Sequence, residues 1–159
     1  MNVSVIRPDG SAWRAWPPWI ATVAVVAVIA FLASPSGPLG GFWRPAADMP
    51  MPTAGQLPLL ILLNLIEVLI FGLGIAFALF GYRLLRSARV ASRSLVLATY
   101  VSIVWLLVGW WPHDSLHIAN GMSMNGLIAI EYGFHVTNMI AGAVVAVFFL
   151  AVLRQRTHG

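Results

Sequence analysis

Long apolar runs, separated by short polar or proline-rich segments, dominate this chain. Four of these runs, at about residues 19–34, 57–82, 94–111 and 126–153, are almost free of charged side chains. A helix needs about 20 apolar residues to cross a hydrocarbon core roughly 30 Å thick. The pattern therefore predicts an all-α protein, a bundle of four transmembrane helices in which residues 1–159 form a single integral membrane domain.

The segments between the apolar runs differ in character. Residues 34–55 are dense in proline and glycine, which disfavour a regular helix and predict an external loop. The third run ends in Trp110, Trp111 and Pro112, where tryptophans suit the membrane interface and a proline stops the helix. Residues 113–125 then form a polar connection into the fourth run.

Composition and charge support this interpretation. Hydrophobic residues make up 60% of the chain and charged residues 9%, a balance that a water-soluble domain could not spread over its surface. The absence of cysteine excludes disulfides and thiolate metal sites. The net charge of +4 comes from arginines gathered at the predicted helix ends, as expected of topology determinants, and we expect no nucleic-acid partner.

The arginines also predict the orientation of the helices. Three groups of arginines lie at the presumed inner ends: Arg7 and Arg14 before the first run, Arg83, Arg86, Arg89 and Arg93 after the second, and Arg154 and Arg156 after the fourth. Positive charge favours the cytoplasmic side. We therefore expect both termini in the cytoplasm, and a location in the plasma (inner) membrane of a bacterium.

Six ionisable residues stand out against this apolar background. Ionisable side chains are costly in lipid, so each is a candidate for a functional role. Glu131 and His135 are four residues apart in the fourth run, which places them on one side of that helix. His113 and His117 have the same spacing in the connection before it, and both imidazoles would point to one side if this segment forms a helical turn or a re-entrant segment. The candidate site consists of Glu67, His113, Asp114, His117, Glu131 and His135.

Counting residues from the outer ends of the helices places Glu67 at a depth similar to that of Glu131 and His135. We therefore expect these three side chains to converge as inner ligands of a metal ion. His113 and His117 would act as outer ligands or as a gate, and Asp114 would orient a histidine. We also expect Asn64 to share a face with Glu67, and Asn138 to share one with His135.

Imidazole and carboxylate together suit a divalent transition metal. Methionine sulfur is a soft ligand for copper(I), and two methionine pairs fall on the predicted outer side, so copper is favoured over iron or zinc. These methionines are Met49, Met51, Met122 and Met124.

The sequence thus predicts a metal-binding membrane protein, a small subunit or accessory of a larger complex that includes other membrane subunits or further copies of itself. Three alternatives stay open: a structural subunit without metal, a proton relay, and a haem- or pigment-binding subunit. No pattern identifies a substrate or a catalytic reaction.

Overall fold

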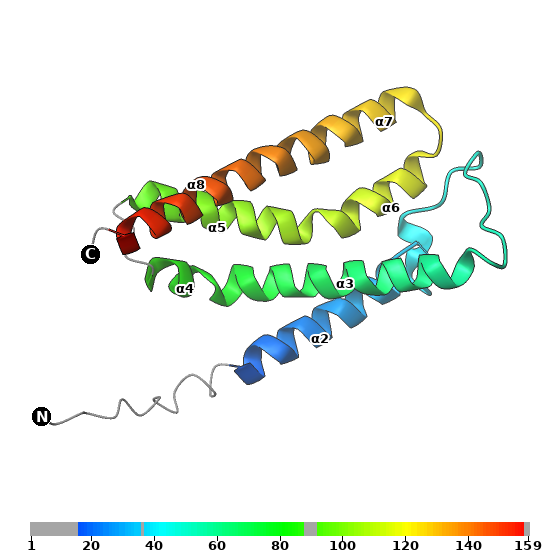
Figure 1. Ribbon diagram of the computed structural model, residues 1–159. Helices are drawn as coiled ribbons and strands as arrows, with labels where there is room; N and C mark the ends of the chain where they lie inside the picture. The colour runs from blue at the N-terminus through cyan, green and yellow to red at the C-terminus, as the bar shows by residue number, and fades with distance from the viewer. Residues whose placement is uncertain (1–15, 36, 88–91, 158–159) are drawn as a thin grey trace, which may run out of the picture.

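The computed structural model describes residues 16–35, 37–87 and 92–157, and within these ranges the regular structure is helical throughout. The long helices in Figure 1 run roughly side by side. The helices are α2 (Trp16–Ala33), the 3₁₀ helix η1 (Gly40–Phe42), α3 (Leu57–Phe80), α4 (Tyr82–Ser87), α5 (Arg93–Val108), α6 (Trp110–Asn120), α7 (Met124–Ile130), the π-helix η2 (Glu131–Val136) and α8 (Thr137–Thr157).

Two of the described helices are long and apolar enough to cross a membrane. They are α3 and the continuous helix Met124–Gln155, which joins α7, η2 and α8. The pair α5 and α6 makes a third if it counts as one span, although the two helices meet at an angle of 46°. The apolar helix Pro17–Ala33, in the first predicted span, is shorter.

The bend between α5 and α6 lies at Gly109. Its N–H donates to the Trp105 carbonyl at 2.9 Å, and its own carbonyl accepts from the His113 N–H at 3.1 Å. Pro112 does not stop the helix here, because it lies in the first turn of α6, where a missing N–H costs no helical hydrogen bond. Residues 113–120, which we expected in a polar connection, are therefore helical.

Small residues allow the helices to pack closely. A Cβ added to Gly72 of α3 would lie 2.7 Å from the Val23 carbonyl oxygen of α2, and one added to Gly74 would lie 2.6 Å from Val108 Cγ1 of α5. Close approach of this kind is the expected role of small residues between membrane helices. Ala27 and Ala30 of α2 and Val68 of α3 form a buried core cluster.

The long helices pack mainly against their neighbours in the sequence. Helix α2 packs on α3, α3 packs on α5 and α6, and α5 packs on α8 (Figure 1). Among the described residues, α2 and α8 do not pack extensively against each other. The helices therefore form a row in which α3 and the bent pair α5–α6 occupy the middle.

The loop before α3 is hydrogen-bonded to the last turns of α6 and to the turn between α6 and α7. The Ala46 N–H donates to the Ile118 carbonyl at 3.1 Å, and the Met122 N–H donates to Asp48 Oδ2 at 3.1 Å. Gly121, at the end of α6, has φ +60° and ψ −136°, a conformation that L side chains rarely adopt. This turn brings α7 back alongside α6 and so positions the candidate site.

Candidate metal centre

Helix α6 contributes two of the candidate histidines. His113 is buried, with 7% of its surface exposed, and His117, one turn later, is partly exposed. Their ring centroids lie 4.5 Å apart, as the four-residue spacing predicts. One side of α6 therefore presents two imidazoles toward the returning helix.

Asp114 is hydrogen-bonded to the inner histidine. The distance from His113 Nδ1 to Asp114 Oδ1 is 2.8 Å. A carboxylate only accepts, so Nδ1 carries the proton and donates, which leaves Nε2 with its lone pair available to a metal. A carboxylate behind a histidine is the usual support of a metal ligand.

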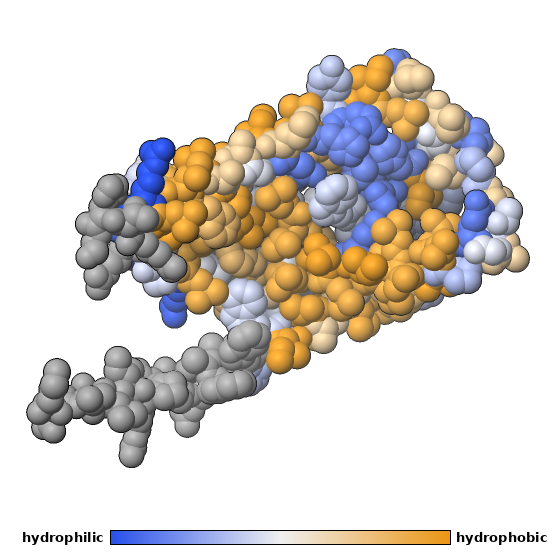
Figure 2. All heavy atoms as spheres, in the orientation of Figure 1, coloured by the Kyte–Doolittle hydropathy of each residue, from blue (hydrophilic) through white to orange (hydrophobic). Residues whose placement is uncertain are grey.

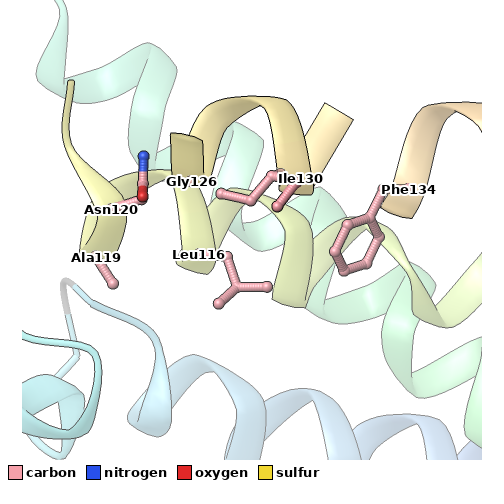
Figure 3. Close-up of a pocket in the computed structure, with 7 residues that line it drawn as sticks. Leu116, Ala119, Asn120, Gly126, Ile130 and Phe134 are labelled. Atoms are coloured by element: carbon pink, nitrogen blue, oxygen red, sulfur yellow. The ribbon is translucent and has the colours of Figure 1, made fainter. Parts of the chain in front are cut away.

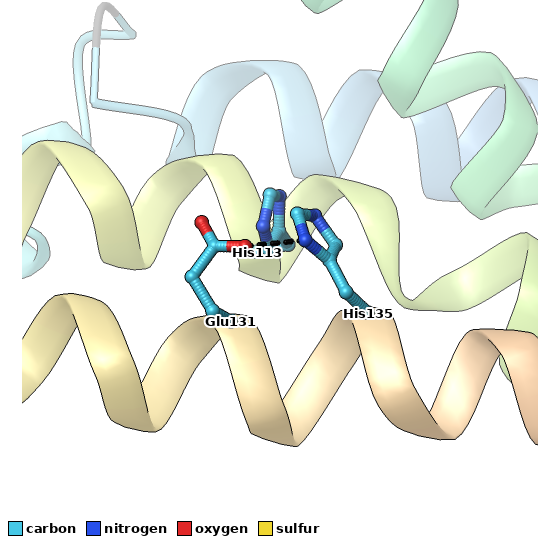
Figure 4. A group of neighbouring side chains, drawn as sticks. All are labelled: His113, Glu131 and His135. Carbon is cyan, nitrogen blue, oxygen red and sulfur yellow. Dashed lines mark ion pairs between the residues drawn. The ribbon is translucent and has the colours of Figure 1, made fainter.

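The returning helix supplies Glu131 and His135, which form an ion pair through Glu131 Oε2 and His135 Nδ1. The His135 ring also lies 4.9 Å from that of His113, measured between centroids. Ligand atoms of His113, Glu131 and His135 all lie within 4.8 Å of one another, close enough to hold a metal ion. Figure 4 shows His113 of α6 facing Glu131 and His135 across the gap between the two helices. We call these three residues the His–Glu–His group.

His117 lies at the edge of this group. Its Nε2 is 3.1 Å from His113 Nε2 and 3.6 Å from Glu131 Oε1. Metal–nitrogen bonds of about 2.0–2.1 Å place two ligands of one ion roughly 3–3.5 Å apart. The two histidine nitrogens are therefore spaced as neighbouring ligands of a single ion would be.

A π-helical turn carries Glu131 and His135, and the sequence analysis did not predict it. The Thr137 hydroxyl donates to the Gly133 carbonyl at 2.5 Å and accepts from Trp105 Nε1 of α5 at 2.9 Å. The Trp105 ring stacks on Phe134, with 5.4 Å between centroids. No residue pattern in the sequence signals this π turn. Single π turns within α-helices are frequent at functional sites.

Glu67 lies outside the His–Glu–His group. Its partly buried carboxyl is hydrogen-bonded to Asp114. Glu67 therefore contacts Asp114, the residue that is hydrogen-bonded to His113, and its predicted role as a direct ligand stays a prediction. This chain of contacts connects α3 to α6.

The two asparagines beside the site do not join the group. Asn64 Nδ2 donates to Ser34 Oγ at 3.1 Å, so it ties α3 to the end of α2. The buried Oδ1 of Asn138 has no hydrogen-bond partner among the described residues. Both asparagines therefore belong to the packing around the site.

The site is open on one side. Glu131 exposes 47% of its side chain and His135 exposes 45%. Figure 2 shows hydrophilic side chains gathered over α6 and the helix α7–α8, within a largely hydrophobic surface. An ion bound by the group would therefore be accessible from this face.

An apolar groove of about 490 Å³ lies between α6 and α7 (Figure 3). Phe134, which lines it, also contacts His113, with ring centroids 5.3 Å apart. The Asn120 amide is occupied by the carbonyls of Gly121 and Ser123. The group therefore borders an apolar space lined by Leu116, Ala119, Asn120, Gly126, Ala129, Ile130 and Phe134.

The methionines that favoured copper lie in other parts of the chain. Met51 is 89% exposed, in the loop before α3, and Met122 and Met124 are exposed near the turn between α6 and α7. Met49 lies in the same loop as Met51 and is partly buried. The donors of the His–Glu–His group are nitrogen and oxygen only.

No protein family model, curated protein or solved structure matches this chain. The function of this chain therefore has to be inferred from the chemistry of the site itself.

Proposed function

We propose that this chain is an integral membrane protein that binds one divalent transition metal through His113, Glu131 and His135. The observation that carries the proposal is the convergence of three ligand atoms within 4.8 Å, donated by two different helices. The Asp114 carboxylate behind His113 adds the support that metal-bound histidines usually have. We infer that His117, whose Nε2 lies 3.1 Å from His113 Nε2, would serve as a fourth ligand.

The membrane topology we propose has four crossings with both termini in the cytoplasm. Helices α2, α3, α5–α6 and α7–α8 would each cross once, with the 17 residues of Pro17–Ala33 extending roughly 26 Å. Arg83, Arg86, Arg93 and Arg154 lie at one end of these helices, while Arg44 lies in the loop near the other end. That asymmetry supports a plasma membrane protein with its arginine-rich end inside.

The donor set favours zinc, iron(II) or copper(II). Two histidines and one glutamate hold the metal of several zinc enzymes, and two histidines with one carboxylate hold non-haem iron. The exposed methionines add no sulfur donor to the group, so copper(I) has less support than it had from the sequence. The metal preference is therefore a matter for direct measurement.

A metal held by three protein ligands keeps positions open for water or another ligand. The open side of the site and the adjacent groove would let an external molecule reach those positions. Because the described chain offers no soluble domain of its own, we place it as a small subunit or accessory in a membrane complex.

A structural role is the second candidate, and one observation favours it. The polar side chains of the site already have hydrogen-bond or ion-pair partners without an ion. The pairs are Asp114 with His113, His113 with His117, and Glu131 with His135. Such a network could fasten α6 to the helix α7–α8.

Metal titration of the detergent-purified, chelator-treated protein separates these candidates. We expect one equivalent of zinc or iron(II) to bind the wild type, and His135→Ala to abolish tight binding. Tyr132→Ala is the matched control, because Tyr132 is 70% exposed on the same helix and belongs to no ligand set. Wild-type protein that binds no metal would leave the structural role as the explanation.

A further inference from the structure

Exposed arginines gather at the end of the bundle where α3 ends and α5 begins (Figure 1). Arg83 and Arg86 are three residues apart on α4, which places them on one side of that helix. Helix α4 packs on α5, whose first residue is Arg93. We call Arg83, Arg86 and Arg93 the arginine cluster. The other arginines expected at this end, Arg7, Arg14 and Arg89, lie outside the described residues.

No acidic group in the described part of the chain neutralises the arginine cluster. Its three guanidinium groups make no hydrogen bond or ion pair with a described residue. The acidic residues of the described chain lie elsewhere, in the loop before α3 and around the candidate metal centre: Asp48, Glu67, Asp114 and Glu131. Even on α3 itself, about 20 Å of helix separate Glu67 from Phe80 at the arginine end. The cluster is therefore free to attract a negatively charged ligand.

The start of α5 adds to the positive charge. The free N–H groups in the first turn of a helix carry partial positive charge, which acidic side chains commonly offset. The first turn of α5 holds Arg93 and no acidic residue, and the Ser92 side chain accepts a hydrogen bond from one of its N–H groups, that of Leu95 at 3.3 Å. An anion beside Arg93 would offset both the guanidinium charge and the helix dipole.

Arginine and phosphate match in charge and in shape. The planar guanidinium donates two parallel hydrogen bonds to two phosphate oxygens. Arg83 and Arg86 follow Phe80, the last residue of α3, at a distance of at most about 5 and 9 Å of helix. The headgroup layer beside the hydrocarbon core is roughly 5–8 Å thick. In the proposed topology these arginines therefore lie at the level of the lipid phosphates.

Exposed leucines beside the arginines favour a lipid over a soluble phosphate. Leu84, between the two arginines of α4, is 61% exposed, and Leu79, in the last turn of α3, is 64% exposed. Leu97, one turn into α5, is 53% exposed. A ligand that contacts both kinds of side chain carries a negatively charged phosphate and apolar chains, which is the composition of an anionic phospholipid.

We propose that the arginine cluster binds the phosphate group of an anionic phospholipid, with the acyl chains of that lipid on the exposed leucines. This inference rests on the proposed membrane location. It does not require that a metal is bound, because none of the three arginines belongs to the His–Glu–His group.

Native mass spectrometry of the full-length protein in detergent measures this binding. The probes are phosphatidylglycerol, which is anionic, and phosphatidylcholine with the same acyl chains, which has no net charge. We expect the wild type to bind phosphatidylglycerol more tightly. One arginine near the membrane surface contributes about a fivefold change in affinity for anionic lipid, so Arg86→Gln should weaken this binding about fivefold. The variant with all three arginines replaced by glutamine should bind the two lipids equally.

Arg44→Gln is the matched control, because it removes the same charge from an exposed arginine in the loop before α3. It should leave phosphatidylglycerol binding unchanged. Equal binding of the two lipids to the wild type, or equal effects of Arg44→Gln and Arg86→Gln, would overturn the proposal.

Glycerol phosphate separates a lipid from a soluble ligand, because it carries the phosphate without acyl chains. It should not displace phosphatidylglycerol from the wild type. Displacement would assign the arginine cluster to a soluble phosphate ester and overturn the lipid proposal. Alkaline extraction of cell membranes that contain the protein tests the membrane location separately, since a chain can stay in the membrane fraction without preferring an anionic lipid.

Discussion

Asp114 accepts a hydrogen bond from His113 Nδ1 at 2.8 Å, although the two residues are neighbours in the sequence. The bond leaves His113 Nε2 facing His117 Nε2 at 3.1 Å, and His113 offers a ligand atom within 4.8 Å of those of Glu131 and His135. A local pair in α6 would thus decide which nitrogen of the buried histidine meets a bound ion. This makes Asp114 a positioning residue, one that acts through His113.

Replacing that carboxylate should weaken the metal site without removing a ligand. We expect Asp114→Asn to lower metal affinity by about ten- to a hundredfold, because loss of a partner behind a ligand histidine has effects of this size. Competition with a chelator of known affinity measures the change. Asp48→Asn makes the same chemical change in the loop before α3 and should leave affinity unaltered. Equal effects of the two substitutions would refute the special role of Asp114.

Glu67 provides a separate test, because it contacts Asp114 and lies outside the His–Glu–His group. We expect Glu67→Gln to keep one equivalent of metal, with a smaller loss of affinity than Asp114→Asn causes. Glu131→Gln, which changes a proposed ligand in the same way, should lose tight binding. Metal analysis of the two purified variants makes the comparison. If Glu67→Gln lost its metal completely, Glu67 would have to be counted as a ligand.

Thr137 follows the π-helical turn at the site, and its hydroxyl bonds to both the Gly133 carbonyl and Trp105 Nε1. Thr137→Val keeps the shape of the side chain and removes both bonds. We expect a loss of about 0.5–1.5 kcal/mol of stability, the usual net contribution of a hydrogen bond that is not deeply buried, together with weaker metal binding. Thermal unfolding in detergent measures the first effect and metal titration the second.

Thr22→Val is the matched control for this change. The Thr22 hydroxyl also donates to a helix carbonyl four residues earlier, that of Pro18 at 2.8 Å, but it lies in α2, away from the site. The control should leave metal affinity unchanged. An equal loss of affinity in both variants would show that Thr137 has no particular role in the metal centre.

The turn that returns α7 toward α6 requires glycine at position 121. Its φ of +60° is strained for other residues, and an added Cβ would collide with the Asp48 carboxylate and with the Ala46 side chain. We expect Gly121→Ala to destabilise the protein by about 1–3 kcal/mol. Gly55→Ala, where an added Cβ meets nothing within 4 Å, should not lower the unfolding temperature. Similar melting of the two variants would contradict this account of the turn.

Much of the helical structure could be predicted from residue patterns. The apolar run at 57–82 corresponds to α3 at Leu57–Phe80, and the four-residue spacings of His113 with His117 and Glu131 with His135 predicted which imidazoles and carboxylates meet. These features depend on helix geometry and on hydrophobicity, both of which are local properties of the sequence.

The neighbours of Glu67 could not be predicted in the same way. Its depth follows from counting residues, but the direction of its side chain depends on which helix packs on α3. Among the described residues α3 packs on α5 and α6, and α7–α8 packs on the other side of that pair. Glu67 therefore meets Asp114 of α6, which is hydrogen-bonded to His113.

X-ray absorption at the metal edge of the loaded wild-type protein tests the central claim most directly. We expect only nitrogen and oxygen neighbours at about 2.0–2.2 Å, with the outer-shell scattering of at least two imidazoles, and a decrease in that scattering in His113→Ala. A sulfur neighbour at about 2.3 Å, or a spectrum without imidazole, would contradict a metal held by His113, Glu131 and His135.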